Sequence, residues 1–77
     1  MEIYGTIKFY QPDKFGFVIP DGIPAEDRAR HVYIHPRALH RSNLTSLEAG
    51  QRVAFVTQKA RKPDMKDEVG TLRLLID

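Results

Sequence analysis

Apolar and polar residues alternate along much of this chain with a period of two, rather than the period of 3.6 that marks an amphipathic helix. In residues 3–10, Ile7 and Phe9 stand at odd-numbered positions, and Lys8 and Tyr10 stand at even-numbered positions. We call this odd or even placement the parity of a residue. This alternation predicts a β-strand with one side facing a core. Counted strictly, it assigns Phe9 to the core side and Tyr10 to the outer side.

Four further segments show the same strand-like character, each bounded by residues that favour turns. The predicted strands span residues 15–19, 31–35, 52–59 and 69–76. Residues 25–29 and 37–40 leave room for one helical turn each. Five short strands in 77 residues predict an all-β fold, a small antiparallel barrel that is closed or nearly closed. The length fits one domain, residues 1–77.

The composition is that of a folded chain without disulfide bonds. Hydrophobic residues make up 42% of the sequence, which argues against intrinsic disorder. There is no cysteine, so disulfides, thiolate zinc sites and cysteine nucleophiles are excluded. No apolar run approaches the roughly 18–20 residues of a membrane span, and residues 1–10 lack the layout of a signal peptide. We therefore expect a cytoplasmic protein with no membrane partner.

Positive charge gathers in one segment although the chain as a whole is nearly balanced. Lys and Arg outnumber Asp and Glu by only 12 to 10, too small an excess to indicate a polyanionic partner. Arg61 and Lys62 lie in a basic stretch from Lys59 to Lys66, interrupted by the acidic Asp64. Such a stretch is either a solvated loop or a set of phosphate contacts, and both interpretations stay open.

Four rings share one side of the second and third predicted strands. Phe15 and Phe17 have the same parity, as do Tyr33 and His35. The opposite parity is mostly aliphatic and supplies a core. Rings left on the outer side can stack on unpaired nucleobases while Lys or Arg meets the phosphates. Alternating rings are also common inside cores, so parity alone leaves both interpretations open.

Several short segments carry a resemblance to a known family. They are KFY at 8–10, KFGFV at 14–18, VYIH at 32–35 and SLEAGQRVAF at 46–55. They resemble the cold-shock domain, whose second and third strands carry motifs near K-G-F-G-F-I and V-F-V-H-F. The resemblance runs from Gly5 to about Leu74. It implies an antiparallel five-stranded oligonucleotide-binding (OB) barrel.

The resemblance also implies a function and its residues. Members of the family bind single-stranded DNA and RNA with modest sequence preference, and many act as RNA chaperones or as regulators of transcription or translation. Phe9 stands where the family has a stacking tryptophan, so the resemblance places on the binding face a ring that strict alternation assigns to the core. The predicted interface consists of Lys8, Phe9, Tyr10, Lys14, Phe15, Phe17, Tyr33, His35, Arg61 and Lys62.

The chain departs from the family pattern at several positions. Lys14 runs directly into Phe15, without the first glycine of the family motif. Pro36 stands where an aromatic residue should follow His35, and Leu44 stands where an aromatic residue often caps the binding face. With at least two rings missing, we expect weaker binding or a shorter footprint than in a typical bacterial cold-shock protein.

Other kinds of site find little support in the sequence. His31 and His35 would be about 13 Å apart on a strand that rises roughly 3.3 Å per residue, so they cannot hold one metal ion together. No catalytic pair and no glycine-rich phosphate loop is present. We therefore expect no enzyme activity, including nuclease activity, no metal and no cofactor.

Two interpretations of the aromatic face remain. The leading one is a single-stranded RNA- or DNA-binding module that acts as a monomer. The alternative is a protein-interaction or self-associating β-barrel module that uses the same aromatic face. A dimer formed by strand exchange is a variant of the alternative, because the central loops are long.

Overall fold

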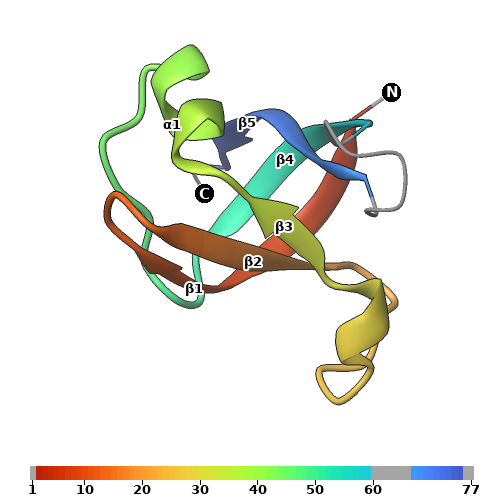
Figure 1. Cartoon of the computed structure of the whole chain (residues 1–77). Coiled ribbons are helices and arrows are strands. Elements are labelled where there is room, and N and C mark those ends of the chain that lie inside the picture. Colours follow the sequence, from red (N-terminus) through yellow and green to blue (C-terminus); the bar gives the residue numbers. More distant parts are fainter. Residues whose placement is uncertain (1, 60–66, 76–77) are drawn as a thin grey trace.

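The computed structural model describes residues 2–59 and 67–75, and within these it contains five strands and two short helices (Figure 1). In chain order the elements are β1 (Ile3–Gln11), β2 (Phe15–Pro20), the 3-10 helix η1 (Arg28–Arg30), β3 (Val32–Ile34), α1 (Pro36–Arg41), β4 (Arg52–Gln58) and β5 (Glu68–Leu74). All five predicted strands are present. The two segments predicted to hold a helical turn correspond to η1 and α1, with η1 starting later than expected.

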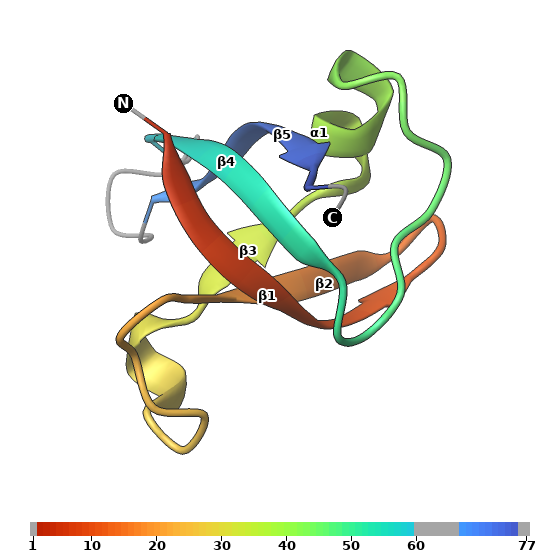
Figure 2. The ribbon, with the colours of Figure 1, turned by 180° about the vertical axis from the view of Figure 1, so that it is seen from behind.

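The strands close into a barrel in the order β1-β2-β3-β5-β4, and β4 pairs back onto β1. This confirms the all-β, five-stranded barrel of the OB type. Four of the pairings are antiparallel, as predicted, but β3 and β5 are parallel, with Tyr33 opposite Glu68. A parallel pair needs a long connection between its strands, and here the chain passes through α1 and β4 before it reaches β5 (Figures 1 and 2).

Aliphatic side chains and one phenylalanine fill the barrel. The largest fully buried side chains are Phe55, Ile7, Ile34, Val18, Val53 and Val69. Each of the five strands contributes at least one of them, because alternate residues point inward. The predicted aliphatic core is therefore confirmed.

Helix α1 packs against β5 and contributes to the same core. Its Ala38 and Leu39 are buried, and the Ser42 hydroxyl after the helix accepts a hydrogen bond from the Leu72 amide at 3.0 Å. Pro36 occupies the first turn, where its missing N–H is not needed. Among residues 2–59 and 67–75, no helix is long and apolar enough to cross a membrane.

The β1–β2 ladder contains a bulge at Lys8. Ile7 pairs with Val18, whereas the next pair joins Phe9 to Phe17, so Lys8 has no partner on β2. A bulge of one residue reverses the side on which the following residues lie. The strict alternation is therefore wrong beyond Lys8: Phe9 joins the side of Phe17, and Tyr10 packs against the core.

Gly16 makes room for this arrangement. It pairs with Tyr10, and a Cβ atom at Gly16 would lie 2.8 Å from the Tyr10 Cδ1 atom and 2.6 Å from the Phe9 carbonyl oxygen. Real Cβ atoms do not approach other atoms so closely. Glycine at this position thus allows β1 to pass close to β2 and leaves space for the Tyr10 ring.

The turn between β1 and β2 is tight. The Lys14 amide donates a hydrogen bond to the Gln11 carbonyl oxygen at 3.0 Å. Asp13 has a φ of 61°, which is the third-position conformation of a type II turn with proline before it. This turn delivers the chain from Gln11 directly into Phe15, without the additional glycine of the family motif.

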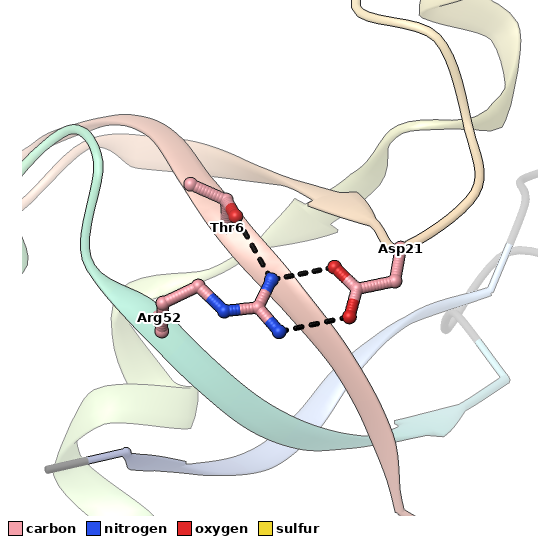
Figure 3. Close-up of polar contacts among 3 residues, drawn as sticks. All are labelled: Thr6, Asp21 and Arg52. Carbon is pink, nitrogen blue, oxygen red and sulfur yellow. Dashed lines mark hydrogen bonds and ion pairs between the residues drawn. The ribbon is translucent and has the colours of Figure 1, made fainter. Parts of the chain in front are cut away.

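An ion pair ties the turn after β2 to β4 (Figure 3). The Arg52 guanidinium group donates two hydrogen bonds to the Asp21 carboxylate, at 2.5 and 2.8 Å, and a third to the Thr6 hydroxyl at 3.2 Å. The hydrogen bond from Arg52 holds the pKa of Asp21 below its ordinary value. Because Thr6 lies on β1, the three side chains connect three neighbouring strand segments at this end of the barrel.

Candidate nucleic-acid interface

Five rings form one continuous, partly exposed surface, which we call the ring cluster. Its members are Phe9 from β1, Phe15 and Phe17 from β2, Tyr33 from β3, and His35 directly after β3. Centroids of neighbouring rings lie 5.7–6.3 Å apart. These distances are those of interacting aromatic pairs, so each ring supports its neighbours.

Strand pairing places the rings on one side of the barrel. Phe17 lies opposite Phe9 on β1 and opposite Tyr33 on β3, which gives a row of three rings across three strands. Phe15 lies two residues before Phe17, and its ring is nearly parallel to that of Tyr33, with an interplanar angle of 20°. On the opposite side of the same strands, Val18 and Ile34 are fully buried. The predicted sidedness of rings and aliphatic residues is confirmed for β2 and β3.

His35 links the ring cluster to helix α1. Its ring centroid lies 6.3 Å from that of Tyr33, and its Nδ1 atom accepts a hydrogen bond from the Arg37 amide at 3.1 Å. Because Nδ1 is the acceptor, the neutral ring carries its proton on Nε2. His35 is therefore both a ring of the surface and the N-cap of α1, a second role that was not predicted from the sequence.

Two of the predicted lysines lie next to the ring cluster along the chain. Lys8 occupies the bulge immediately before Phe9 and is partly exposed. Lys14 is exposed in the turn immediately before Phe15. Arg61 and Lys62 lie outside the described residues.

Tyr10 does not join the ring cluster. Its side chain packs against the core, and burial raises the pKa of its phenol, with a smaller contribution from the nearby Asp13 carboxylate. The expectation that Tyr10 lies beside the other rings rested on unbroken alternation, which the bulge at Lys8 interrupts. The bulge that moves Tyr10 inward is the same feature that moves Phe9 outward.

His31 differs in burial from His35, which is partly exposed, and from His40, which is exposed. It is buried, lies before β3 rather than on it, and its Nε2 atom has no hydrogen-bond partner in the part of the chain that the structure describes. Within residues 2–59 and 67–75, no three His, Cys, Asp or Glu side chains are grouped to hold a metal ion.

Comparison with known proteins identifies the family. The sequence model of one family, the 'Cold-shock' DNA-binding domain, matches residues 3–69. This range is most of the chain and includes every member of the ring cluster. The chain belongs to the cold-shock domain family. Cold-shock domain proteins bind nucleic acids and are not enzymes, in agreement with the expectation from the sequence.

Relatives of this cold-shock domain include three bacterial proteins. The chain is 36% identical over 59 residues to a probable cold shock protein of Sinorhizobium fredii, covering 75% of this chain and 78% of the relative. It is 32% identical over 66 residues to the major cold shock protein CspA of Pseudomonas aeruginosa, covering 84% and 87%. It is 38% identical over 52 residues to the cold shock protein CspA of Rhizobium meliloti, covering 66% and 68%.

Two of the departures of this cold-shock domain from the family motifs, at Pro36 and Leu44, are explained by α1. Pro36 begins the helix in place of an aromatic residue. At its end, Asn43 has a φ of 59°, and the Leu44 amide donates to the Leu39 carbonyl oxygen at 2.9 Å. These features form a Schellman motif, in which Leu44 packs against the core. Leu44 therefore ends a helix and does not face the ring cluster.

Proposed function

We propose that this cold-shock domain binds single-stranded RNA or DNA by stacking unpaired bases on the ring cluster. The observation that carries the proposal is the continuous, partly exposed row of rings above a filled aliphatic core. The interior of the barrel is filled by other side chains, so these rings are not part of its core. Their exposure is therefore best explained by a ligand that offers flat apolar faces.

Base stacking suits this surface for physical reasons. Every base has a π-face, and stacking on an aromatic side chain contributes about 1–3 kcal/mol per base with little regard to sequence. Bases in a duplex are already stacked on one another, so only a single strand can use the rings. In this proposal Lys8 and Lys14 contact phosphates at the β1–β2 end of the ring cluster, and Arg61 and Lys62 add contacts from the basic segment.

The test uses a fluorescent oligothymidine and the variant Phe17→Ala. Phe17 lies at the centre of the row, so loss of one stacking ring should weaken binding by roughly 5- to 150-fold, the equivalent of about 1–3 kcal/mol. The matched control is Tyr4→Ala, which removes an exposed ring, 49% accessible, from β1 outside the ring cluster. Equal affinity of wild type and a folded Phe17→Ala variant would contradict the proposal.

We further propose that the domain acts as a monomer in the cytoplasm, as an RNA chaperone or a regulator of transcription or translation. Each strand is paired on both sides within the described barrel, so no free edge requires a second copy. Sequence-tolerant stacking suits a chaperone that must release its RNA.

Size-exclusion chromatography tests the monomer, and the opening of an RNA hairpin labelled with a fluorophore and a quencher tests chaperone activity. A dimer that hides Phe15 and Phe17 and ignores oligonucleotides would support the protein-interaction alternative instead.

A further inference from the structure

A polar cavity of about 200 Å³ adjoins the ring cluster. Its lining residues are His35, Arg37, Arg41, Gln58, Lys59 and Glu68. Three of these side chains carry a fixed positive charge and one carries a negative charge, which leaves an excess of two positive charges. Neither Arg37 nor Arg41 belongs to a family motif or to the basic stretch, so neither was predicted to be a site residue.

The walls of the cavity come from paired strands and from α1. Glu68 pairs with Tyr33 on one side and with Gln58 on the other, so it marks the place where β3, β5 and β4 meet. On the helix, the Arg41 Nε atom donates a hydrogen bond to the Gly70 carbonyl oxygen at 3.1 Å. This contact fixes one guanidinium group at the cavity before any ligand arrives.

His35 connects the cavity to the ring cluster. Its ring lines the cavity and also lies 6.3 Å from the ring of Tyr33. Pro36 begins α1 at the position where the resemblance predicts another ring, and α1 brings Arg37 and Arg41 to the cavity. Where an additional stacking ring would extend the surface, this chain has guanidinium groups instead.

We propose that this cavity is a phosphate subsite that holds one phosphate group of the bound strand where the strand passes His35. The inference rests on the proposed function and adds an anchoring point to it. Guanidinium groups match the geometry of phosphate oxygens, and an ammonium group adds a point charge. Neither Arg37 nor Lys59 forms an ion pair with any other described residue, so both charges are available to a ligand.

The decisive measurement is the salt dependence of oligothymidine binding by the double variant Arg37→Gln/Lys59→Gln. Each phosphate that a protein neutralises on a single strand contributes about −0.7 to the slope of log Kobs against log salt concentration. Loss of the subsite should make the slope shallower by about 0.7. Both replaced side chains are exposed, so the variant should keep its fold, which circular dichroism checks.

Two further variants make the test specific. Arg28→Gln/Arg30→Gln removes the same charge from η1, which lies at the far side of the barrel from α1 (Figures 1 and 2), and should leave the slope unchanged. Glu68→Gln removes the one carboxylate that lines the cavity among the described residues and should tighten binding at low salt, because a negative charge beside the phosphate is lost. A general charge effect predicts equal slope changes for the two double variants, and that result would overturn the inference.

The outcomes separate this inference from the proposed function. If the wild type binds oligothymidine and Arg37→Gln/Lys59→Gln leaves the slope unchanged, the phosphate subsite is wrong and the stacking surface stands. If the wild type binds no oligonucleotide, the proposed function is wrong. Titration with inorganic phosphate at low ionic strength then tests the cavity alone. Amide shifts confined to α1 and the facing ends of β4 and β5 would support it, and their absence would overturn it.

Discussion

Phe9 lies opposite Phe17 across the β1–β2 ladder, with the two ring centroids 5.7 Å apart, because the strand is bulged at Lys8. Before the bulge, Ile7 points into the barrel and is 1% accessible. After it, Phe9 lies on the outer side with the other rings. The bulge at Lys8 therefore places two nearby apolar side chains on opposite sides of the strand. Ile7 contributes to the core, and Phe9 belongs to the ring cluster.

Ile7→Ala should affect mainly stability, and Phe9→Ala should affect mainly binding. Ile7→Ala should lower the free energy of unfolding by about 2–5 kcal/mol, because it leaves a cavity in a packed core. Phe9→Ala should cost much less stability but should weaken oligothymidine binding, by about 1–3 kcal/mol for one stacked base. Urea denaturation and fluorescence anisotropy measure the two quantities. A Phe9→Ala variant as unstable as Ile7→Ala would show that Phe9 belongs to the core.

Gly16→Ala should destabilise the fold by about 1–3 kcal/mol, the cost of forcing atoms into a filled space. The added methyl group would meet the Phe9 carbonyl oxygen at 2.6 Å, and a backbone atom in a strand ladder cannot easily move away. Thermal or urea unfolding gives the measurement.

Gly70→Ala is the matched control for this prediction. Its Cβ atom would lie 3.1 Å from the end of the Gln58 side chain, which can rotate aside, and 3.3 Å from the Val56 carbonyl oxygen, a milder approach than the 2.6 Å at Gly16. We expect a smaller loss of stability than for Gly16→Ala. Equal losses for both variants would mean that the close approach of β1 and β2 at Gly16 is not what requires glycine there.

Alternation of apolar and polar residues predicts the sides of β2 and β3 correctly but fails in β1. The sequence pattern is accurate for β2 and β3, where Phe15, Phe17 and Tyr33 lie on the predicted side. It misses the bulge because apolar residues continue at every second position through Phe9, so a bulged and a regular strand look the same in sequence. The resemblance to the family, which compares positions rather than parities, placed Phe9 correctly.

Local sequence patterns do not predict contacts between segments that are distant in the chain. The parallel pairing of β3 with β5 depends on how the chain crosses the barrel, and no local signal encodes it. The cavity beside His35 is built from three separate segments, and only the Lys59 part carried a visible charge pattern. Pro36 was a usable sign of a helix start, since proline favours the first helical position.

The Asp21–Arg52 ion pair should make stability sensitive to acid. Arg52 lowers the pKa of Asp21 in the folded protein below its ordinary value of 3.8. The pair therefore stabilises the fold at pH values above that ordinary pKa, and this stabilisation is lost as the pH falls through the lower pKa of the folded state.

The variant Asp21→Asn isolates this contribution. The difference in the free energy of unfolding between wild type and variant should be constant near neutral pH and should shrink below about pH 4. High salt should also reduce it, because both side chains are exposed. Urea denaturation over a pH series measures the difference, and a difference that grows as the pH is lowered would contradict the assignment.

His31→Leu should leave the stability unchanged or raise it. The imidazole is 8% accessible, and its Nε2 atom has no hydrogen-bond partner among the described residues. A buried polar atom without a partner has lost its hydrogen bonds to water and gained none in return. An aliphatic side chain of similar size avoids this loss, and the expected gain in the free energy of unfolding is up to about 1–3 kcal/mol.

His40→Leu, on the exposed side of α1, controls for added hydrophobicity and should change little. If His31→Leu lowers stability by more than the control, Nε2 has a partner in the folded protein and His31 contributes to stability as a polar group.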